Sequence, residues 1–172
     1  NPNFAQTHNN LGLLFYGLRE LQKAISSYQK AIEIQPNFAD AHNNLGVTFS
    51  ELRESQKAIN CYEKAIQINS NYADAHNNLG IVFKELGDYQ KAIDCYEKTI
   101  QINSNYAGAH NNLGVIFYEL GKLKKAISCY EKVIQIHPNY AGAYYNLGIV
   151  FNELGKCQKA KSCYEKAIQI DP

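Results

Sequence analysis

A 34-residue sequence pattern occurs five times and accounts for nearly every residue of this chain. The segment Ala39–Gly46 returns unchanged at Ala73–Gly80, with one substitution at Ala107–Gly114, and more loosely at Ala5–Gly12 and Ala141–Gly148. The successive units are about 3–36, 37–70, 71–104, 105–138 and 139–172. Self-similarity at this period predicts stacked small units rather than one globular core. Such an array presents an extended binding surface.

Each unit contains two helical patterns. In the second unit the residues of the first pattern are spaced by three and four positions: His42, Leu45, Gly46, Phe49 and Leu52. The second pattern has the same spacing: Ala58, Ile59, Tyr62, Ala65 and Ile66. Spacings of three and four place side chains on one face of an α-helix. Each unit is therefore predicted to be a pair of antiparallel helices of about 13 residues, joined by short loops.

Residues between the two patterns fit a helix end followed by a new helix start. Gly87 and Gly121 suit the left-handed residue that ends a helix, and Asp88 suits the N-cap of the next one. Pro36, Pro138 and Pro172 end the second helix, because proline lacks a backbone donor and clashes with the preceding turn. Ser70 and Ser104 occupy that place in the second and third units.

One glycine of the first helix recurs in all five units, and Gly46 is the copy in the second. A glycine inside a helix costs about 1 kcal/mol relative to alanine, so its recurrence requires a reason. We expect close approach of the two helices at this position, with Ala58 on the facing side of the second helix.

The pattern His42-x-x-Leu45-Gly46-x-x-Phe49, followed by Ala58-x-x-x-Tyr62 and by Ser70 in the proline position, resembles the tetratricopeptide repeat (TPR) family. Two features depart from the family pattern: histidine opens the motif in four units, and serine replaces proline in two. The resemblance covers the whole chain. It implies an all-α fold, a right-handed superhelical α-solenoid of five TPR helix-turn-helix repeats whose first helices line an inner groove. It also implies a binding module for peptides and partner domains.

An asparagine occupies the sixth position of every repeat, counted from Ala39 and its copies, on the groove side of the first helix: Asn10, Asn44, Asn78, Asn112 and Asn146. The side-chain amide offers one acceptor and two donors, which match the C=O and N–H groups of an extended peptide. The column resembles the asparagine ladder in the TPR superhelix of O-linked N-acetylglucosamine transferases, where asparagines hold substrate peptides by their main chain. The alternative is that duplication copied an arbitrary asparagine. We refer to these residues as the Asn ladder.

An acidic column runs beside the Asn ladder: Glu51, Glu85, Glu119 and Glu153, joined by Asp40 and Asp74. Ordinary solvated charge is the alternative interpretation. If the groove binds a segment, these carboxylates favour a neutral or basic one. The same column, together with a formal net charge of +1, argues against nucleic acid as a partner.

An apolar column also faces the groove: Leu13, Val47, Ile81, Val115 and Ile149. Packing between adjacent first helices is the favoured role for these residues, and a strip that contacts a ligand is the alternative. Tyr16, Tyr118 and Tyr145 are candidate aromatic anchors at the groove edge.

No catalytic or cofactor chemistry is expected from this chain. Histidines one unit apart are separated by about 9–10 Å, the helix-packing distance, which is too far to share a metal ion. The cysteine column is separated in the same way, and the sequence contains no phosphate-binding loop or nucleophile elbow. We therefore expect a non-enzymatic protein with no cofactor and no metal.

The sequence also predicts a cellular location for the protein and its relation to a longer chain. No apolar stretch is long enough to span a membrane, and unpaired cysteines favour a reducing, cytoplasmic location. The sequence lacks methionine and begins and ends inside the repeat pattern, so we expect 1–172 to be one TPR array taken from a longer protein. Two alternatives to a peptide-binding scaffold remain: a self-assembling scaffold with end-to-end association, and the substrate-recruiting arm of a multidomain enzyme such as a glycosyltransferase.

Overall fold

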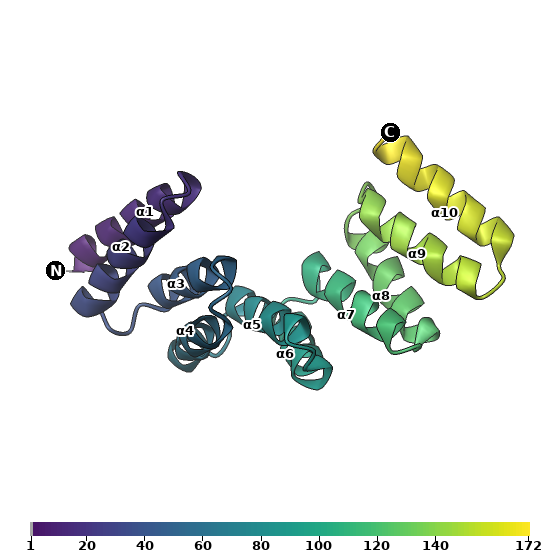
Figure 1. Ribbon diagram of the computed structural model, residues 1–172. Helices are drawn as coiled ribbons and strands as arrows, with labels where there is room; N and C mark the ends of the chain where they lie inside the picture. Colours follow the sequence, from purple (N-terminus) through teal and green to yellow (C-terminus); the bar gives the residue numbers. More distant parts are fainter. Residues whose placement is uncertain (1) are drawn as a thin grey trace. The chain divides into compact units, whose positions relative to one another are not determined.

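The computed structural model describes residues 2–172, and the regular structure of these residues is α-helical throughout (Figure 1). The helices are α1 (Pro2–Gly17), α2 (Leu21–Ile34), α3 (Ala39–Glu51), α4 (Ser55–Ile68), α5 (Ala73–Glu85), α6 (Tyr89–Ile102), α7 (Ala107–Glu119), α8 (Leu123–Ile136), α9 (Ala141–Glu153) and α10 (Cys157–Ile170). In the second repeat the first helix has 13 residues and the second has 14. The predicted all-α class and the paired helices are confirmed.

The helices form two compact units, Asn1–Asp88 and Tyr89–Pro172. In the N-terminal unit, α1 packs on α2 and α3 packs on α4, while α2 contacts α3 and α4 contacts α5. The first helices α1, α3 and α5 also contact one another in order. In the C-terminal unit α7 pairs with α8 and α9 pairs with α10, while α6 contacts α7, α8 contacts α9, and α7 contacts α9. Contacts between first helices bring their groove-side residues to one face within each unit.

Close helix approach at the recurring glycine is confirmed, and its partner is a tyrosine ring. A Cβ atom added at Gly46 would lie 2.7 Å from Cε1 of Tyr62, a side chain that is only 2% exposed. The same relation holds between Gly114 and Tyr130, where the distance is 2.6 Å. Ala58 is fully buried as well. The glycine therefore creates the space that the tyrosine of the second helix fills.

The turn inside each hairpin contains a residue with positive φ. Gly87 has a φ of 78°, and Gly121 and Gly155 have similar values, as the sequence predicts for the middle repeats. Arg19 and Arg53 adopt the same conformation in the first two hairpins, with φ values of 62° and 59°. The geometry of this turn is therefore retained where an arginine replaces the glycine.

Proline is not required to end the second helix. Helix α4 ends at Ile68, in the same register as α2, although Ser70 stands where the first repeat has Pro36. In this loop the side-chain oxygen of Asn69 accepts a hydrogen bond of 3.1 Å from the backbone N–H of Asn71. Asn103 and Asn105 form the same bond in the third repeat. The asparagine turn thus stabilises the loop in the two repeats that lack proline.

The histidine that opens the motif anchors the preceding loop. Nε2 of His42 lies 3.0 Å from the carbonyl oxygen of Pro36, and His110 makes the equivalent contact with Ser104. Burial lowers the pKa of His42, which favours the neutral ring. The departure from the aromatic family pattern therefore adds a hydrogen bond between the first helix and the loop before it.

Candidate functional site

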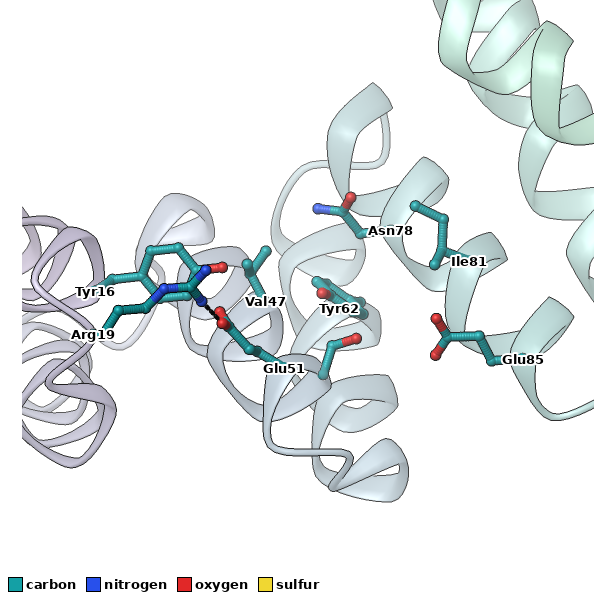
Figure 2. Close-up of a pocket in the computed structure, with 9 residues that line it drawn as sticks. Tyr16, Arg19, Val47, Glu51, Tyr62, Asn78, Ile81 and Glu85 are labelled. Atoms are coloured by element: carbon teal, nitrogen blue, oxygen red, sulfur yellow. Dashed lines mark ion pairs between the residues drawn. The ribbon is translucent and has the colours of Figure 1, made fainter. Parts of the chain in front are cut away.

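A pocket of about 400 Å³ lies on the face where the first helices of the N-terminal unit meet (Figure 2). Its lining residues come from α1, α3, α4, α5 and the turn after α1: Tyr16, Arg19, Val47, Ser50, Glu51, Tyr62, Asn78, Ile81 and Glu85. Three of the predicted site residues, Asn78, Glu51 and Glu85, therefore meet at one pocket. We call it the N-terminal pocket.

Residues of the apolar column form part of the pocket wall. Val47 and Ile81 are both half-buried and both line the N-terminal pocket. Both side chains are thus accessible to a ligand. This agrees with the alternative role for the apolar column, which is contact with a ligand rather than packing between adjacent first helices. Tyr16 also lines the pocket, while Tyr118 and Tyr145 belong to the C-terminal unit, where the Tyr145 ring centroid lies 6.0 Å from that of Tyr164.

Three asparagines of the Asn ladder, Asn44, Asn78 and Asn146, donate a hydrogen bond to an asparagine of the preceding repeat. Nδ2 of Asn44 donates to Oδ1 of Asn9 over 3.0 Å, and Nδ2 of Asn78 donates to Oδ1 of Asn43 over 3.1 Å. In the C-terminal unit Asn146 donates to Asn111 over 3.4 Å. The acceptors at Asn9 and Asn43 are buried, with 3% and 7% exposure. These inter-repeat bonds fix the orientation of the ladder amides.

The inter-repeat bond uses one of three hydrogen-bonding sites on each amide. Asn44 and Asn78 are half-buried. The inter-repeat bond does not use the second Nδ2–H or the Oδ1 of either side chain. Asn10 differs, because its Oδ1 accepts a bond of 2.9 Å from Nε2 of Gln6. Asn112 is half-buried on α7. The pairing between the fifth and sixth positions was missed by sequence reasoning, although the two asparagine columns recur side by side.

Most carboxylates of the acidic column already have a partner. Glu51 forms an ion pair with Arg19 (Figure 2). In the C-terminal unit the hydroxyl of Tyr89 donates to Glu119 and that of Tyr118 donates to Glu153, and each bond raises the pKa of its tyrosine. For Glu85, the described residues provide neither an ion pair nor a hydrogen bond.

The predicted aspartates lie outside the N-terminal pocket. Asp40, in the first turn of α3, accepts a hydrogen bond from the hydroxyl of Tyr72. Burial is the main cause of the raised pKa of Tyr72, and this bond adds to it. Asp74 is in the first turn of α5 and also contributes to that pKa shift. Neither aspartate is among the residues that line the pocket.

Tyr62 also lines the pocket, although the sequence pattern indicates only a packing role for it. Its ring is buried beneath Gly46, and its hydroxyl shares a hydrogen bond with Ser50. Burial raises the pKa of Tyr62 well above its ordinary value, and the nearby Glu85 carboxylate contributes to this shift. Tyr62 is therefore a neutral hydrogen-bonding group at the pocket.

Other chemistry-bearing side chains are dispersed or shielded. Burial raises the pKa of the Cys61 and Cys129 thiols to about 11, which keeps them protonated near neutral pH. Within residues 2–172 no group of three His, Cys, Asp or Glu side chains is placed to hold a metal ion. None of the helices in this part of the chain combines the length and apolar character that a membrane span needs.

Family models for the tetratricopeptide repeat match most of the chain. One matches residues 5–38, 73–106 and 141–172, another matches 27–60 and 95–128, and a TPR repeat model matches 54–87 and 115–155. A comparison with curated proteins gave no match.

Solved structures show the same all-α repeat fold. The crystal structure of MamA is 28% identical over 94% of both chains, with a TM-score of 0.85. The structure of YrrB, described as a TPR protein with an unusual peptide-binding site, is 27% identical, with a TM-score of 0.76. The match with YrrB covers 96% of this chain and 85% of that one. PilF of Pseudomonas aeruginosa is 24% identical, with a TM-score of 0.92 over 99% of this chain and 78% of its own, and supports the fold alone.

Proposed function

Because the chain belongs to the tetratricopeptide repeat family, we propose that it is a protein-interaction module that holds an extended peptide segment at the N-terminal pocket. The observation that carries this proposal is the pocket itself. It combines a ladder amide, apolar side chains and two tyrosines, contributed by α1, α3, α4 and α5. Concave sites with apolar walls and a few placed polar groups are typical of ligand binding.

Two residues of the Asn ladder, Asn44 and Asn78, supply the main-chain contacts in this proposal. Asn78 lines the pocket, and Asn44 is the preceding rung on α3. Each amide is oriented by its bond to the previous repeat and retains one donor and one acceptor. An extended backbone presents C=O and N–H groups that match this pair. The resemblance of the ladder to that of O-linked N-acetylglucosamine transferases agrees with the same role.

The comparison with YrrB supports the proposal, because that protein is described as having a peptide-binding site and is similar over most of this chain.

Free cysteines suit a reducing compartment. The free cysteines of this chain are Cys61, Cys95, Cys129, Cys157 and Cys163. We therefore propose the cytoplasm as the location of this interaction.

The test uses an array of ten-residue synthetic peptides and measures the strongest binder by fluorescence anisotropy. Asn78→Ala removes one backbone contact worth about 0.5–1.5 kcal/mol, so binding should weaken about twofold to twelvefold. Asn146→Ala is the matched control, because it removes the same kind of inter-repeat bond in the C-terminal unit. It should leave the affinity unchanged.

Methylation of single backbone nitrogens in the peptide identifies which group the amide holds. One N-methylated position should weaken binding to the parent protein and have little further effect on Asn78→Ala, since the contact is already lost. If Asn78→Ala binds the peptide as tightly as Asn146→Ala does, this amide does not hold the segment. If no peptide of the array binds, the proposed function itself fails.

A further inference from the structure

The N-terminal pocket contains two carboxylates in different electrostatic states. Glu51 is neutralised by the guanidinium of Arg19, which reaches it from the turn after α1. Glu85 lies across the pocket on α5, and the described residues offer it no ion pair and no hydrogen bond (Figure 2). Among the described residues, Glu85 is thus the carboxylate of this pocket that forms no ion pair, although Arg53, the counterpart of Arg19 one repeat later, lines a neighbouring pocket together with Glu85.

The remaining walls suit a long side chain with a charged end. Val47 and Ile81 provide aliphatic contact, and the aromatic residues Tyr16 and Tyr62 also line the pocket. Lysine and arginine bury an aliphatic stem and keep the charge at the end, where it meets polar groups. The volume of about 400 Å³ lies within the usual range for a ligand pocket, about 300–1,000 Å³.

The chain itself already places a guanidinium at this pocket. Arg19 has a positive φ of 62°, and the corresponding position in the last three hairpins is glycine. Its side chain is 75% exposed, yet its guanidinium pairs with Glu51 on the next hairpin. This contact is an internal example of a cation bound at the pocket edge, and it occupies only one of the two carboxylates.

In the C-terminal unit, by contrast, the equivalent carboxylates are engaged by neutral groups. Glu119 accepts from Tyr89 and Glu153 accepts from Tyr118. The acidic column is therefore not a uniform strip of negative charge. Glu85 differs from Glu51, Glu119 and Glu153 in lacking such a partner among the described residues.

We propose that the N-terminal pocket is a subsite for one lysine or arginine side chain of the bound segment, with Glu85 as its counter-ion. This inference rests on the proposed function, since it requires a peptide at the same pocket. Arg19 limits the subsite to a single cation by holding Glu51. An acidic side chain is excluded by repulsion from Glu85.

The test starts from peptides selected on the same ten-residue array. The strongest binders should share one lysine or arginine position, and replacing that residue by norleucine keeps the aliphatic stem while removing the charge. The norleucine peptide should bind about twofold to fivefold more weakly, as expected for a partly exposed ion pair. Raising the NaCl concentration from 0.05 to 0.5 M, about a tenfold change in ionic strength, should reduce this difference.

Glu85→Gln identifies the counter-ion. The variant should bind the lysine and norleucine peptides equally, because only the charge pair is removed. Glu119→Gln is the matched control, since it changes the corresponding residue of the next repeat in the other unit. It should retain the full difference between the two peptides.

Arg19→Gly releases Glu51 without straining the turn, because glycine occupies this conformation in the last three hairpins. The lysine peptide should then bind about twofold more tightly, an effect within the range of exposed ion pairs, and Arg19→Gly with Glu51→Gln should remove the gain. If Arg19→Gly weakens the lysine peptide more than the norleucine peptide, the assignment of the pocket as a cation subsite is overturned.

Two further results separate the subsite from the proposed function. Peptides that bind without a shared basic position, or a lysine–norleucine difference that survives Glu85→Gln, overturn the subsite and leave peptide binding intact. Absence of binding by every peptide of the array overturns both.

Discussion

At the residue scale, the recurring glycine of the first helix and the tyrosine of the second form one packing unit. In the second repeat the space beside Gly46 is filled by the Tyr62 ring, whose hydroxyl reaches Ser50 at the N-terminal pocket. The same residue therefore packs the hairpin and forms part of the candidate site. A substitution at the glycine should therefore change the free energy of unfolding more than it changes peptide affinity.

We predict that Gly46→Ala lowers the free energy of unfolding by up to about 2 kcal/mol. Alanine improves the intrinsic helix propensity by about 1 kcal/mol, but its methyl group would lie 2.7 Å from a buried tyrosine ring. Overpacking of this kind costs about 1–3 kcal/mol and should exceed the gain. Urea-induced unfolding followed by circular dichroism measures the difference.

The matched control for this prediction is Gly142→Ala in α9. There the nearest atom to an added Cβ is 3.5 Å away, an ordinary contact, so the variant should be as stable as the parent or more stable. Equal stabilisation by both substitutions would show that helix propensity, rather than the tyrosine ring, decides the effect at Gly46.

Sequence reasoning identified which residues recur, but not which atoms they contact. The prediction that Asn78, Glu51 and Glu85 face the groove follows from helical spacing, and the three do line one pocket. The bond from Asn78 to Asn43 joins residues 35 positions apart, so no periodicity within a helix reveals it. The pairing of Arg19 with Glu51 depends on the positive φ of Arg19, and an arginine in the sequence does not predict that backbone conformation.

At the element scale, helix ends were predictable because their signals are local. Helix α2 stops at Ile34, two residues before Pro36, and α4 stops in the same register before Ser70. Gln35 has φ and ψ of −135° and 89°, and Asn69 has −134° and 96°. The loop backbone at this point is therefore the same whether or not proline follows. What the sequence did not indicate is that Asn69 itself closes the turn.

We predict that Ser70→Pro raises the free energy of unfolding by about 0.4–1 kcal/mol. Proline restricts the unfolded chain, and the backbone before position 70 already matches that before Pro36. The contact between His76 and the carbonyl oxygen of residue 70 can be retained, because proline keeps its carbonyl group. Thermal unfolding should show a higher midpoint temperature.

Asn71→Pro is the control at the neighbouring position, and the opposite sign is expected for it. The N–H of Asn71 donates to the side chain of Asn69, and proline would remove that donor. Stabilisation by Asn71→Pro would contradict the role assigned to the asparagine turn.

At the scale of the whole molecule, the chain combines five similar repeats with two compact units, and the boundary falls at Asp88–Tyr89 inside the third repeat. Near-identity of the repeats therefore does not make their sites equivalent. The N-terminal unit contains the pocket with Glu85, for which the described residues provide no ion pair or hydrogen bond, and the C-terminal unit pairs its column glutamates with tyrosines. Binding is thus expected to stabilise the two units unequally.

We predict that a peptide selected on the array protects backbone amides of Asn1–Asp88 from hydrogen exchange more than those of Tyr89–Pro172. A ligand at 100 times its Kd stabilises the form that binds it by about 2.7 kcal/mol. Amides that exchange through opening of the N-terminal unit, including those of α3 and α5, should then exchange about 100-fold more slowly. Hydrogen exchange with mass spectrometry resolves the two units. Greater protection of α7 and α9 would instead place the bound segment on the C-terminal unit, where Glu119 and Glu153 are already engaged, and the N-terminal pocket would lose its assigned role.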